Sequence, residues 1–389
     1  MKVVYIASQL HCRGGIERII CDKTAWLCSH GVEVEIILTG SDSEAFFYEF
    51  DSQIRFHFLG IDYADCRGVR GLLKKAKRKK DHAKQLNSAL LSANADITIF
   101  TDPSDLFLLR GLTDRSVKIC EWHYHRNNSL LSIRYNTRNP FSYFVNMCRE
   151  ELQLFKKEQH IKQLSRFVVL TNRDAKQWRR LDNITAIPNF SNFTCREDVV
   201  YTARRVIAVG HLSKGKQFDH LISAWRSIHK LHPDWRLSIF GDGAQRVALQ
   251  NQIDGLGLQE VIKLEGATKD ISKEYSRSSI YAMTSSSEGF GLVILEAMIH
   301  HLPVVSYNCP CGPGDLVDNN KSGILIDRVG DIEGLTSALL RLIESEDLRR
   351  EMGENGYEKS KQFSQDIVMG KWMSLFEELI KNNDTSNDK

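Results

Sequence analysis

Short apolar runs alternate with polar or helix-like segments along most of the chain. The runs cover residues 3–7, 32–38, 54–59, 97–100, 117–121, 167–170, 184–187, 205–209, 235–240, 261–264 and 280–283. Runs of four to seven residues have the length of buried β-strands. Strands that alternate with helices predict an α/β fold, in which helices cover both faces of a parallel sheet. Such sheets bind their ligands beyond the carboxyl ends of the strands.

The length of 389 residues predicts two domains of this kind, because single domains usually hold about 100 to 200 residues. Residues 190–201 show no clear periodicity, which predicts a hinge in this part of the chain. We therefore expect a first domain over residues 1–190 and a second over residues 191–365. Residues 366–389 add an apolar helical stripe, and their polar tail, 382–389, is expected to be disordered.

Two adjacent glycines, Gly14 and Gly15, follow the first apolar run and precede a helical pattern that extends to His30. A strand, a glycine-rich loop and a helix in this order are typical of the first unit of a Rossmann-type half. A dinucleotide site would require Gly-X-Gly-X-X-Gly, and this loop has only the glycine pair. A plain turn is the alternative role of the two glycines.

A second glycine-containing turn follows residues 280–283. It reads SSSEGFG, with Glu288, Gly289 and Gly291 in the turn, and leads into an apolar helix that begins at Leu292. The glycines allow a ligand to come close to the backbone. The start of the helix presents N–H groups that have no partner within the helix. This combination predicts a binding site for a diphosphate.

Glu288 and Glu296 are eight positions apart, which corresponds to roughly 12 Å along one helix. This separation is too large for a catalytic carboxylate pair, so we expect the two residues to have different roles. Glu288 is expected to reach a sugar beside the phosphates, and Glu296 to accept hydrogen bonds from two ribose hydroxyls. In the alternative, Glu288 caps the helix and Glu296 is a core carboxylate that a neighbour satisfies.

The segment from Glu288 to Glu296 resembles the motif Glu, seven residues, Glu of the retaining glycosyltransferases of family 4. The resemblance covers nearly the whole chain. It is strongest over residues 206–327, where Val-Gly-X-Leu, Gly-Asp-Gly, the glutamate pair and Cys-Pro-Cys-Gly-Pro follow one another as in the family. It implies the GT-B fold, with two Rossmann-like domains facing each other across a cleft. The first domain would bind the acceptor, the second would bind the nucleotide sugar, and the last helix would cross back to the first domain.

The same resemblance assigns the residues of the site. Catalytic roles fall on His123, Glu288 and Lys216, with His125 as the second choice for the histidine. Nucleotide-sugar binding falls on Gly14, Gly15, His211, Lys216, Gly266, Glu288, Gly289, Phe290, Gly291, Leu292 and Glu296. The chain departs from the family at His211, where an arginine is expected, and at Gln217, where a glycine is expected. Because neutral imidazole lacks the charge and the fork of guanidinium, Lys214 is a candidate to replace the arginine.

The resemblance further implies retaining transfer of a hexose or an N-acetylhexosamine from a UDP-sugar to a saccharide acceptor, either lipid-linked or part of a lipopolysaccharide or capsule glycan. The sequence contains no Asp-X-Asp triplet, so we expect neither a metal nor another cofactor. Lysine and N–H groups would stabilise the leaving diphosphate instead. The alternative is a catalytically inactive protein of this fold that binds a nucleotide sugar or a membrane surface. Cys309 and Cys311 have no second cysteine pair nearby, which argues against a zinc or redox motif.

The net charge of +3 is small, but nine basic side chains and one acid occupy the segment that begins with Arg67 and ends with Lys84. As an amphipathic helix, this segment is suited to an anionic phospholipid surface; a solvated helix face is the alternative. Nucleic acid is not expected as a partner, because the segment lacks aromatic stacking residues. There is no signal-peptide pattern, no apolar run of about 20 residues and an odd number of scattered cysteines. We therefore expect a cytoplasmic protein, peripheral on the inner face of the membrane.

Overall fold

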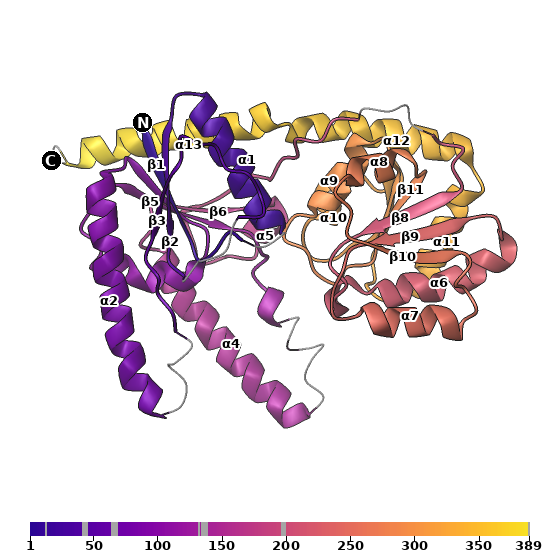
Figure 1. Ribbon diagram of the computed structural model, residues 1–389, viewed down its shortest axis with the longest axis horizontal. Coiled ribbons are helices and arrows are strands. Elements are labelled where there is room, and N and C mark those ends of the chain that lie inside the picture. Colours follow the sequence, from indigo (N-terminus) through magenta and orange to yellow (C-terminus); the bar gives the residue numbers. More distant parts are fainter. Residues whose placement is uncertain are drawn as a thin grey trace. The chain divides into compact units, whose positions relative to one another are not determined.

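The structure of the protein is a computed structural model. The structure describes residues 1–11, 14–40, 46–63, 69–130, 133, 139–195 and 200–387. The chain divides into two compact units, each with its own sheet (Figure 1). The first unit consists of Met1–His123, Asn136–Ile187 and Met369–Lys389, and the second of Tyr124–Tyr135 and Pro188–Val368. The short segment Tyr124–Tyr135 therefore belongs to the second unit although it lies within the first half of the sequence.

The first unit contains a parallel sheet to which seven strands of the described residues contribute, in the order β3-β2-β1-β4-β5-β6-β7. The strands are β1 (Lys2–Ala7), β2 (Glu33–Leu38), β3 (Arg55–Phe58), β4 (Ile97–Phe100), β5 (Val117–Trp122), β6 (Arg166–Val169) and β7 (Ile184–Ala186). Each lies on one of the apolar runs, shifted by at most a residue or two at its ends. The central strands β1, β4 and β5 are buried along almost their whole length, because helices cover both faces of the sheet.

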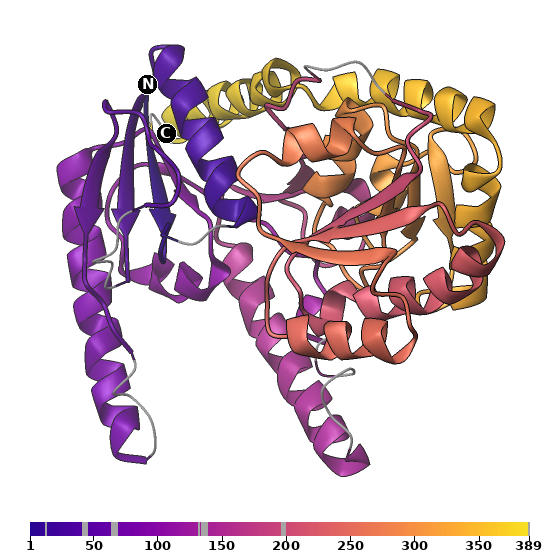
Figure 2. The same cartoon turned by 45° about the vertical axis from the view of Figure 1, so that its right-hand side comes forward.

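Helices surround this sheet, as Figures 1 and 2 show. They are α1 (Gly15–Ser29), α2 (Val69–Ala93), the 3₁₀ segment η1 (Pro103–Gly111), α4 (Pro140–Ile161), α5 (Asn172–Ala175) and most of α13 (Gln365–Asn387). Helix α5 begins after Thr171, whose hydroxyl accepts a hydrogen bond of 3.1 Å from the backbone N–H of Asp174 and so caps the helix.

A buried ion pair lies in the core of the first unit. The ammonium of Lys23, on α1, donates to the carboxylate of Glu121, on β5, and both side chains are fully buried. The same ammonium lies 4.4 Å from the ring centroid of Trp372, on α13. This pair therefore connects a helix, a strand and the C-terminal helix. No local pattern in the sequence indicates this pair.

The C-terminal helix corrects one expectation. Residues 382–389 were expected to be disordered, but α13 continues to Asn387, and Asp388 and Lys389 lie outside the described residues. Within the first unit, Asn383 donates a hydrogen bond of 3.3 Å to the carbonyl of Arg115. The polar composition misled the prediction, because the helix is anchored upstream by buried apolar residues such as Trp372 and Phe376.

The second unit contains another parallel sheet, built from six strands of the described residues in the order β10-β9-β8-β11-β12-β13. The strands are β8 (Arg205–Val209), β9 (Arg236–Phe240), β10 (Ile262–Gly266), β11 (Ile280–Met283), β12 (Val304–Tyr307) and β13 (Gly323–Ile326). The helices are η2 (Lys214–Lys216), α6 (Phe218–Leu231), α7 (Arg246–Gly255), α8 (Ile271–Ser276), α9 (Leu292–Ile299), α10 (Pro313–Leu316), α11 (Ile332–Ile343), α12 (Glu346–Ser360) and η3 (Lys361–Phe363).

Two units, each with helices on both faces of a parallel sheet, confirm the predicted α/β class with Rossmann-like halves. In the second unit the strand order reverses between β8 and β11, which are adjacent in the sheet although β9 and β10 lie between them in sequence. The carboxyl ends of these two strands are therefore where a ligand site is expected. Among the described residues, no helix combines the length and the apolar character needed to span a bilayer.

Candidate active site

The turn that follows β11 leads directly into α9. Gly291 is the N-cap of this helix and has a φ of 92°, a left-handed conformation that other residues adopt only with strain. The N–H of Ile294 donates to the carbonyl of Gly291 at 2.9 Å, so helical bonding begins at once. The predicted strand, glycine turn and helix are thus present with the predicted start at Leu292.

The loop after β8 lies beside this turn and is hydrogen-bonded to it. The hydroxyl of Thr284 donates to the carbonyl of Lys216 at 2.8 Å. Ser286 donates to the carbonyl of Gly215 from both its backbone N–H, at 2.8 Å, and its hydroxyl, at 3.0 Å. Thr284 and Ser286 therefore join the two loops at the switch point of the sheet.

This junction brings together two of the residues that the sequence placed in the site. The ammonium of Lys216 lies 2.6 Å from a carboxylate oxygen of Glu288, and their side chains are 24% and 12% exposed. A charge-assisted contact of this length is strong and directional. Each side chain nevertheless keeps part of its surface open to solvent. The pair is therefore accessible to a ligand at the start of α9.

A third loop packs against Glu288. Gly312 has a φ of 93°, and a Cβ added there would lie 2.4 Å from the carbonyl oxygen of Phe290 and 3.4 Å from the Cβ of Glu288. Only glycine fits this close approach of two backbones. Phe290 itself is 3% exposed, with its ring 5.8 Å from that of Phe363. Phe290 thus anchors the turn, while Gly289 and Leu292 are partly exposed at its surface.

Cys309 and Cys311 lie in that third loop as free, buried thiols. Burial raises the pKa of the Cys309 thiol well above its usual range, and the nearby charge of Glu288 adds to the effect. A thiol in such surroundings is protonated at neutral pH and therefore a poor nucleophile. The loop accordingly serves to shape the Glu288 turn.

Glu296 is placed differently from Glu288. It lies one turn into α9, as predicted, but it is only 5% exposed, and the hydroxyl of Tyr275 donates to its carboxylate at 3.0 Å. The structure thus contains the neighbour that the alternative for Glu296 required. Tyr275 is separated from Glu296 by 21 residues, and no local pattern in the sequence pointed to it. The ribose-binding role of Glu296 stays a prediction.

The loop after β8 contains the two positions at which the sequence departs from the family that it resembles. Gln217 stands where a glycine was expected, and it adopts a left-handed conformation with a φ of 49°. This is one of the conformations that favour glycine. His211 is exposed. A Cβ added to Gly243 would lie 2.9 Å from a carbon of the His211 ring, so the two residues are close neighbours. Lys214 is likewise exposed, in η2.

Gly266 ends β10 with a φ of 78°, and its carbonyl accepts a hydrogen bond of 2.8 Å from the N–H of Gly241. Asp242 accepts a hydrogen bond of 3.1 Å from the N–H of Ala267 and lies 3.0 Å from the guanidinium of Arg246. Asp242 therefore acts as a turn residue. Gly266 is positioned by this turn at the rim of the same sheet.

The two histidines that follow β5 fall in different units. His125 belongs to the second unit, where its Nε2 lies 2.7 Å from the hydroxyl of Ser287, and that hydroxyl donates to Asn128 at 3.0 Å. Burial lowers the pKa of His125 to about 4, although the charge of Glu288 opposes the shift. A neutral imidazole is thus fixed next to the residue that precedes Glu288. The family resemblance made His125 the second choice, and no local pattern indicates that its segment belongs to the second unit.

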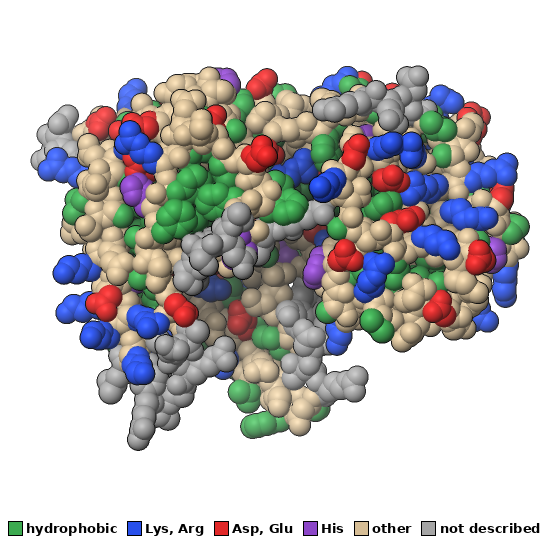
Figure 3. Space-filling view, in the orientation of Figure 1, with side chains coloured by type: hydrophobic (Ala, Val, Ile, Leu, Met, Phe, Trp, Pro, Cys, Tyr) green, Lys and Arg blue, Asp and Glu red, His purple; other side chains and the backbone are tan. Residues whose placement is uncertain are grey.

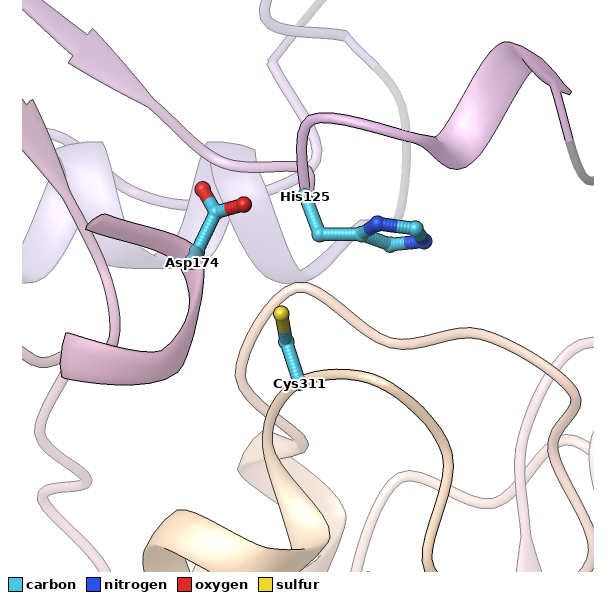
Figure 4. Close-up of side chains that lie close together, drawn as sticks. All are labelled: His125, Asp174 and Cys311. Carbon is cyan, nitrogen blue, oxygen red and sulfur yellow. The ribbon is translucent and has the colours of Figure 1, made fainter. Parts of the chain in front are cut away.

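Figure 4 shows His125 on the segment after β5 and Cys311 on the loop that precedes α10, both in the second unit. Asp174, drawn in the same figure, belongs to α5 of the first unit, where it accepts a hydrogen bond of 3.3 Å from the indole of Trp178. Asp174 is therefore part of the packing of the first unit.

His123 belongs to the first unit. It is 7% exposed, and its Nε2 lies 3.7 Å from the Glu121 carboxylate. Burial lowers the pKa of His123, with the Glu121 charge opposing and the Lys23 charge adding to the shift, so the ring is neutral at pH 7. Among the described residues, neither ring nitrogen has a hydrogen-bond partner. The ring is therefore able to bond to a ligand.

Gly14 and Gly15 also lie in the first unit, at the start of α1. Gly14 is the N-cap, and its carbonyl accepts a hydrogen bond of 3.2 Å from the hydroxyl of Tyr48. A Cβ on Gly14 would lie 2.1 Å from a carboxylate oxygen of Glu17, so a side chain there would displace Glu17. Cys12 and Arg13, on the same loop, lie outside the described residues.

Comparisons with known proteins identify relatives of this sequence and of this fold. Residues 198–359 match the family model "Glycosyl transferases group 1". An uncharacterized glycosyltransferase of Haemophilus influenzae is 24% identical over 383 residues, which cover 96% of this chain and 99% of that protein. The amylovoran biosynthesis glycosyltransferase AmsD of Erwinia amylovora is 31% identical over 218 residues, covering 54% of this chain and 61% of AmsD.

A further relative, the exopolysaccharide phosphotransferase SCO2592 of Streptomyces coelicolor, is 28% identical over 412 residues. The match covers 99% of this chain but 41% of the relative, so the chain spans less than half of that protein's length.

Solved structures share the fold. The sucrose-phosphate synthase of Thermosynechococcus elongatus matches with a TM-score of 0.79 at 17% identity, over 98% of this chain and 99% of that one. The pneumococcal O-GlcNAc transferase GtfA, solved with UDP and GlcNAc, matches with a TM-score of 0.73 at 15% identity, over the same shares. The chain thus carries a glycosyl transferases group 1 domain at residues 198–359 and has a GT-B fold, as its sequence predicted.

Proposed function

We propose that this protein is a retaining glycosyltransferase that moves a hexose or an N-acetylhexosamine from a UDP-sugar to a saccharide acceptor. The observation that carries the proposal is the contact between Lys216 and Glu288 at the start of α9. It places a cation, a carboxylate and the N–H groups of a helix start within one half-open region of the second unit.

Each of these groups has a task in sugar transfer. The N–H groups of α9 and the ammonium of Lys216 would stabilise the negative charge that grows on the leaving diphosphate. Lys216 would exchange its contact with Glu288 for a phosphate oxygen. The freed carboxylate of Glu288 would then accept hydrogen bonds from sugar hydroxyls. Gly291 lets the ligand approach the backbone without a side chain in the way.

The donor and the acceptor are proposed by analogy with the relatives. GtfA was solved with UDP and GlcNAc, and AmsD is named for amylovoran biosynthesis. For the acceptor we favour a lipid-linked saccharide or a lipopolysaccharide or capsule glycan. The phosphotransferase name belongs to a relative much longer than this chain, so phosphate transfer is not part of the proposal.

His123 is the histidine that we propose to lie near the reacting carbon. Its two ring nitrogens are buried without a hydrogen-bond partner among the described residues, and the ring is neutral. A neutral imidazole in this state can donate one hydrogen bond to a sugar hydroxyl and accept another. We propose no metal and no other cofactor, because the sequence lacks an Asp-X-Asp triplet and Lys216 supplies the positive charge.

A donor panel tests the proposed reaction. The protein is incubated with UDP-, GDP- and ADP-sugars and a glycan acceptor, with and without EDTA, and the anomeric configuration of the product is read by NMR. We expect transfer from a UDP-sugar with retained configuration and with less than a twofold effect of EDTA. Inversion, or loss of transfer in EDTA, would contradict the mechanism. Tight UDP binding without transfer or hydrolysis would favour the inactive binding protein.

We also propose that α2 contacts an anionic membrane surface. Its side chains are described from Lys74 onward; Arg67 lies outside the described residues, as does the side chain of Arg70. Five lysines of its first half are exposed, namely Lys74, Lys75, Lys77, Lys79 and Lys80, and Figure 3 shows basic side chains gathered over this helix. Seven cysteines of the described residues are free, which fits a reducing compartment and so the cytoplasmic face.

Vesicle flotation tests this contact. Each basic side chain near such a surface contributes about 1 kcal/mol, so the double variant K75E/K77E should lower binding to phosphatidylserine vesicles by roughly 30-fold or more. Vesicles of phosphatidylcholine alone serve as the uncharged control. Equal binding of the variant and the wild-type protein would show that α2 is only a solvated helix face.

A further inference from the structure

Helix α4 carries an exposed apolar stripe along most of its length. It begins after Asn139, whose side chain accepts hydrogen bonds from two N–H groups of the first turn, and has Pro140 as its first residue. The stripe consists of Phe141, Val145, Cys148, Leu152 and Phe155, all of them exposed, with Phe141 reaching 77%. Successive members are four, three, four and three residues apart. This is the spacing of the apolar residues that form the seam of a two-stranded coiled coil.

The stripe does not face the sheet of its own unit. The buried residues of α4 are Leu154, Glu158 and Ile161. At 100° per residue, they lie about 120° around the helix from the centre of the stripe. In both ribbon views α4 extends away from the sheet of the first unit (Figures 1 and 2). The stripe is therefore presented outward, where a helix from another molecule can reach it.

Charged residues flank the stripe in an asymmetric way. Arg149 and Lys156 lie along one edge and Glu151 along the other, and all three are exposed. In a parallel pair of such helices, the residue at the g position of one helix faces the e position five residues later in its partner. Glu151 would then face Lys156 of a second copy. An antiparallel pair would instead bring Arg149 and Lys156 against each other.

These observations favour a second copy over a lipid surface. A helix that lies on anionic lipid has basic residues on its polar face. The charged side chains near the stripe of α4 instead mix Arg149, Lys156 and Lys157 with Glu150 and Glu151. We propose that α4 pairs in parallel with α4 of a second copy of this chain, through its apolar stripe.

The length of the stripe limits the affinity that we expect for the α4 dimer. From Phe141 to Phe155 it spans about 21 Å, or roughly four helical turns. A stable interface usually buries about 1,600 Å², more than one short helix pair provides. The dimer should therefore be weak, with a dissociation constant in the micromolar range, and should respond to concentration.

Sedimentation velocity on the full chain, from about 1 to 100 μM, tests this pairing. The wild-type protein should change from monomer to dimer over this range. Leu152→Glu places a charge within the seam and should weaken association at least tenfold. Gln153→Glu is the matched control, because it adds the same charge at an exposed position away from the stripe, and it should leave association unchanged. Each variant is checked by circular dichroism, since the exposed side chains should not affect folding.

Cys148 provides a second and independent readout. It is exposed at the middle of the stripe, and parallel pairing places it opposite the same residue of the second copy. With copper phenanthroline and dioxygen as oxidant, the two thiols should lose two electrons and two protons and form an intermolecular disulfide. Cys148→Ser should abolish this covalent dimer and retain the non-covalent one.

Three results would overturn the proposal. One is a monomer at every concentration. Another is a dimer that Leu152→Glu leaves intact, or one in which Cys148 does not cross-link. The last is a monomer that loses binding to phosphatidylserine vesicles when Leu152 is replaced by glutamate, because that result would assign the stripe to lipid.

Discussion

Replacement of Lys216 by alanine should lower the kcat of sugar transfer by about 10²- to 10³-fold. The reason is that its ammonium, now 2.6 Å from Glu288, supplies a fixed positive charge beside the turn that leads into α9. The leaving diphosphate gains negative charge as the glycosidic bond breaks, and without Lys216 only N–H groups would oppose it. Initial-rate kinetics with a saturating UDP-sugar measures the effect.

Glu288→Gln should cause a loss of similar size, because it keeps the shape of the side chain and removes the charge that would hold the sugar hydroxyls. The folded state should change little. The pair is partly exposed, so its contribution to the free energy of unfolding is expected to be about 0 to 1 kcal/mol. A large loss of activity with normal unfolding would separate a catalytic role from a structural one.

Lys214→Ala is the matched control for Lys216→Ala. It removes the same charge two residues earlier, from an exposed position in η2. We expect less than a tenfold loss of kcat. If instead Lys214→Ala were the more damaging variant, the phosphate contact would belong to Lys214, the residue proposed to replace the missing arginine at His211.

Replacement of Lys23 by methionine should lower the free energy of unfolding by about 3 to 5 kcal/mol. Lys23 and Glu121 are both fully buried, so the variant leaves a carboxylate without its counter-ion in the core of the first unit. The double variant K23M/E121M should recover most of the loss, because it removes both charges. Urea denaturation, followed by circular dichroism, measures all three proteins.

Glu378→Gln is the control for the corresponding carboxylate variant, Glu121→Gln. Glu378 lies 2.8 Å from Arg166 but is 53% exposed, so the same chemical change should cost less than about 1 kcal/mol there. If Glu121→Gln cost no more than Glu378→Gln, the buried pair would not be a determinant of stability.

The same core predicts the effect of pH. Burial tends to raise the pKa of Glu121, but the charge of Lys23 and its hydrogen bond to the carboxylate outweigh this effect, and the pKa lies below its ordinary value. A carboxylate with a lowered pKa adds stability above its unfolded pKa of about 4.3 and loses it as the pH falls through the folded value. Burial lowers the pKa of His123, so this residue affects the free energy of unfolding at a higher pH than Glu121 does. Below about pH 6.5 the histidine binds a proton in the unfolded chain but not in the folded one, which lowers stability. Stability should thus decline between pH 7 and pH 4, and the decline below pH 4 should be smaller in Glu121→Gln.

The sequence predicted local features well. The bounds of β8 and β11 and the start of α9 agree with the apolar runs and with the glycine turn, because buried parallel strands need continuous apolar residues. Gln217 stood out as a non-glycine residue at a glycine position, and the structure gives it the left-handed conformation that explains the family's preference.

Features that depend on distant segments could not be predicted. Tyr275 reaches Glu296, and Ser287 reaches His125 across 162 residues, through the packing of elements rather than through any periodic pattern. The assignment of Tyr124–Tyr135 to the second unit is of the same kind. The burial of Lys23 could not be predicted, because a lone lysine in an amphipathic helix is usually solvated. Only its contacts with Glu121 on β5 and Trp372 on α13 show that it is buried.

Titration calorimetry of UDP tests the central claim, that a nucleotide diphosphate binds at the start of α9 with Lys216 on its phosphates. We expect UDP to bind the wild-type protein at least tenfold more tightly than uridine does, since hydrogen bonds to a charged group contribute about 1.5 to 3 kcal/mol. Lys216→Ala should remove most of this difference, and Lys214→Ala should preserve it. Equal affinities for UDP and uridine, or an unchanged UDP affinity in Lys216→Ala, would contradict the claim.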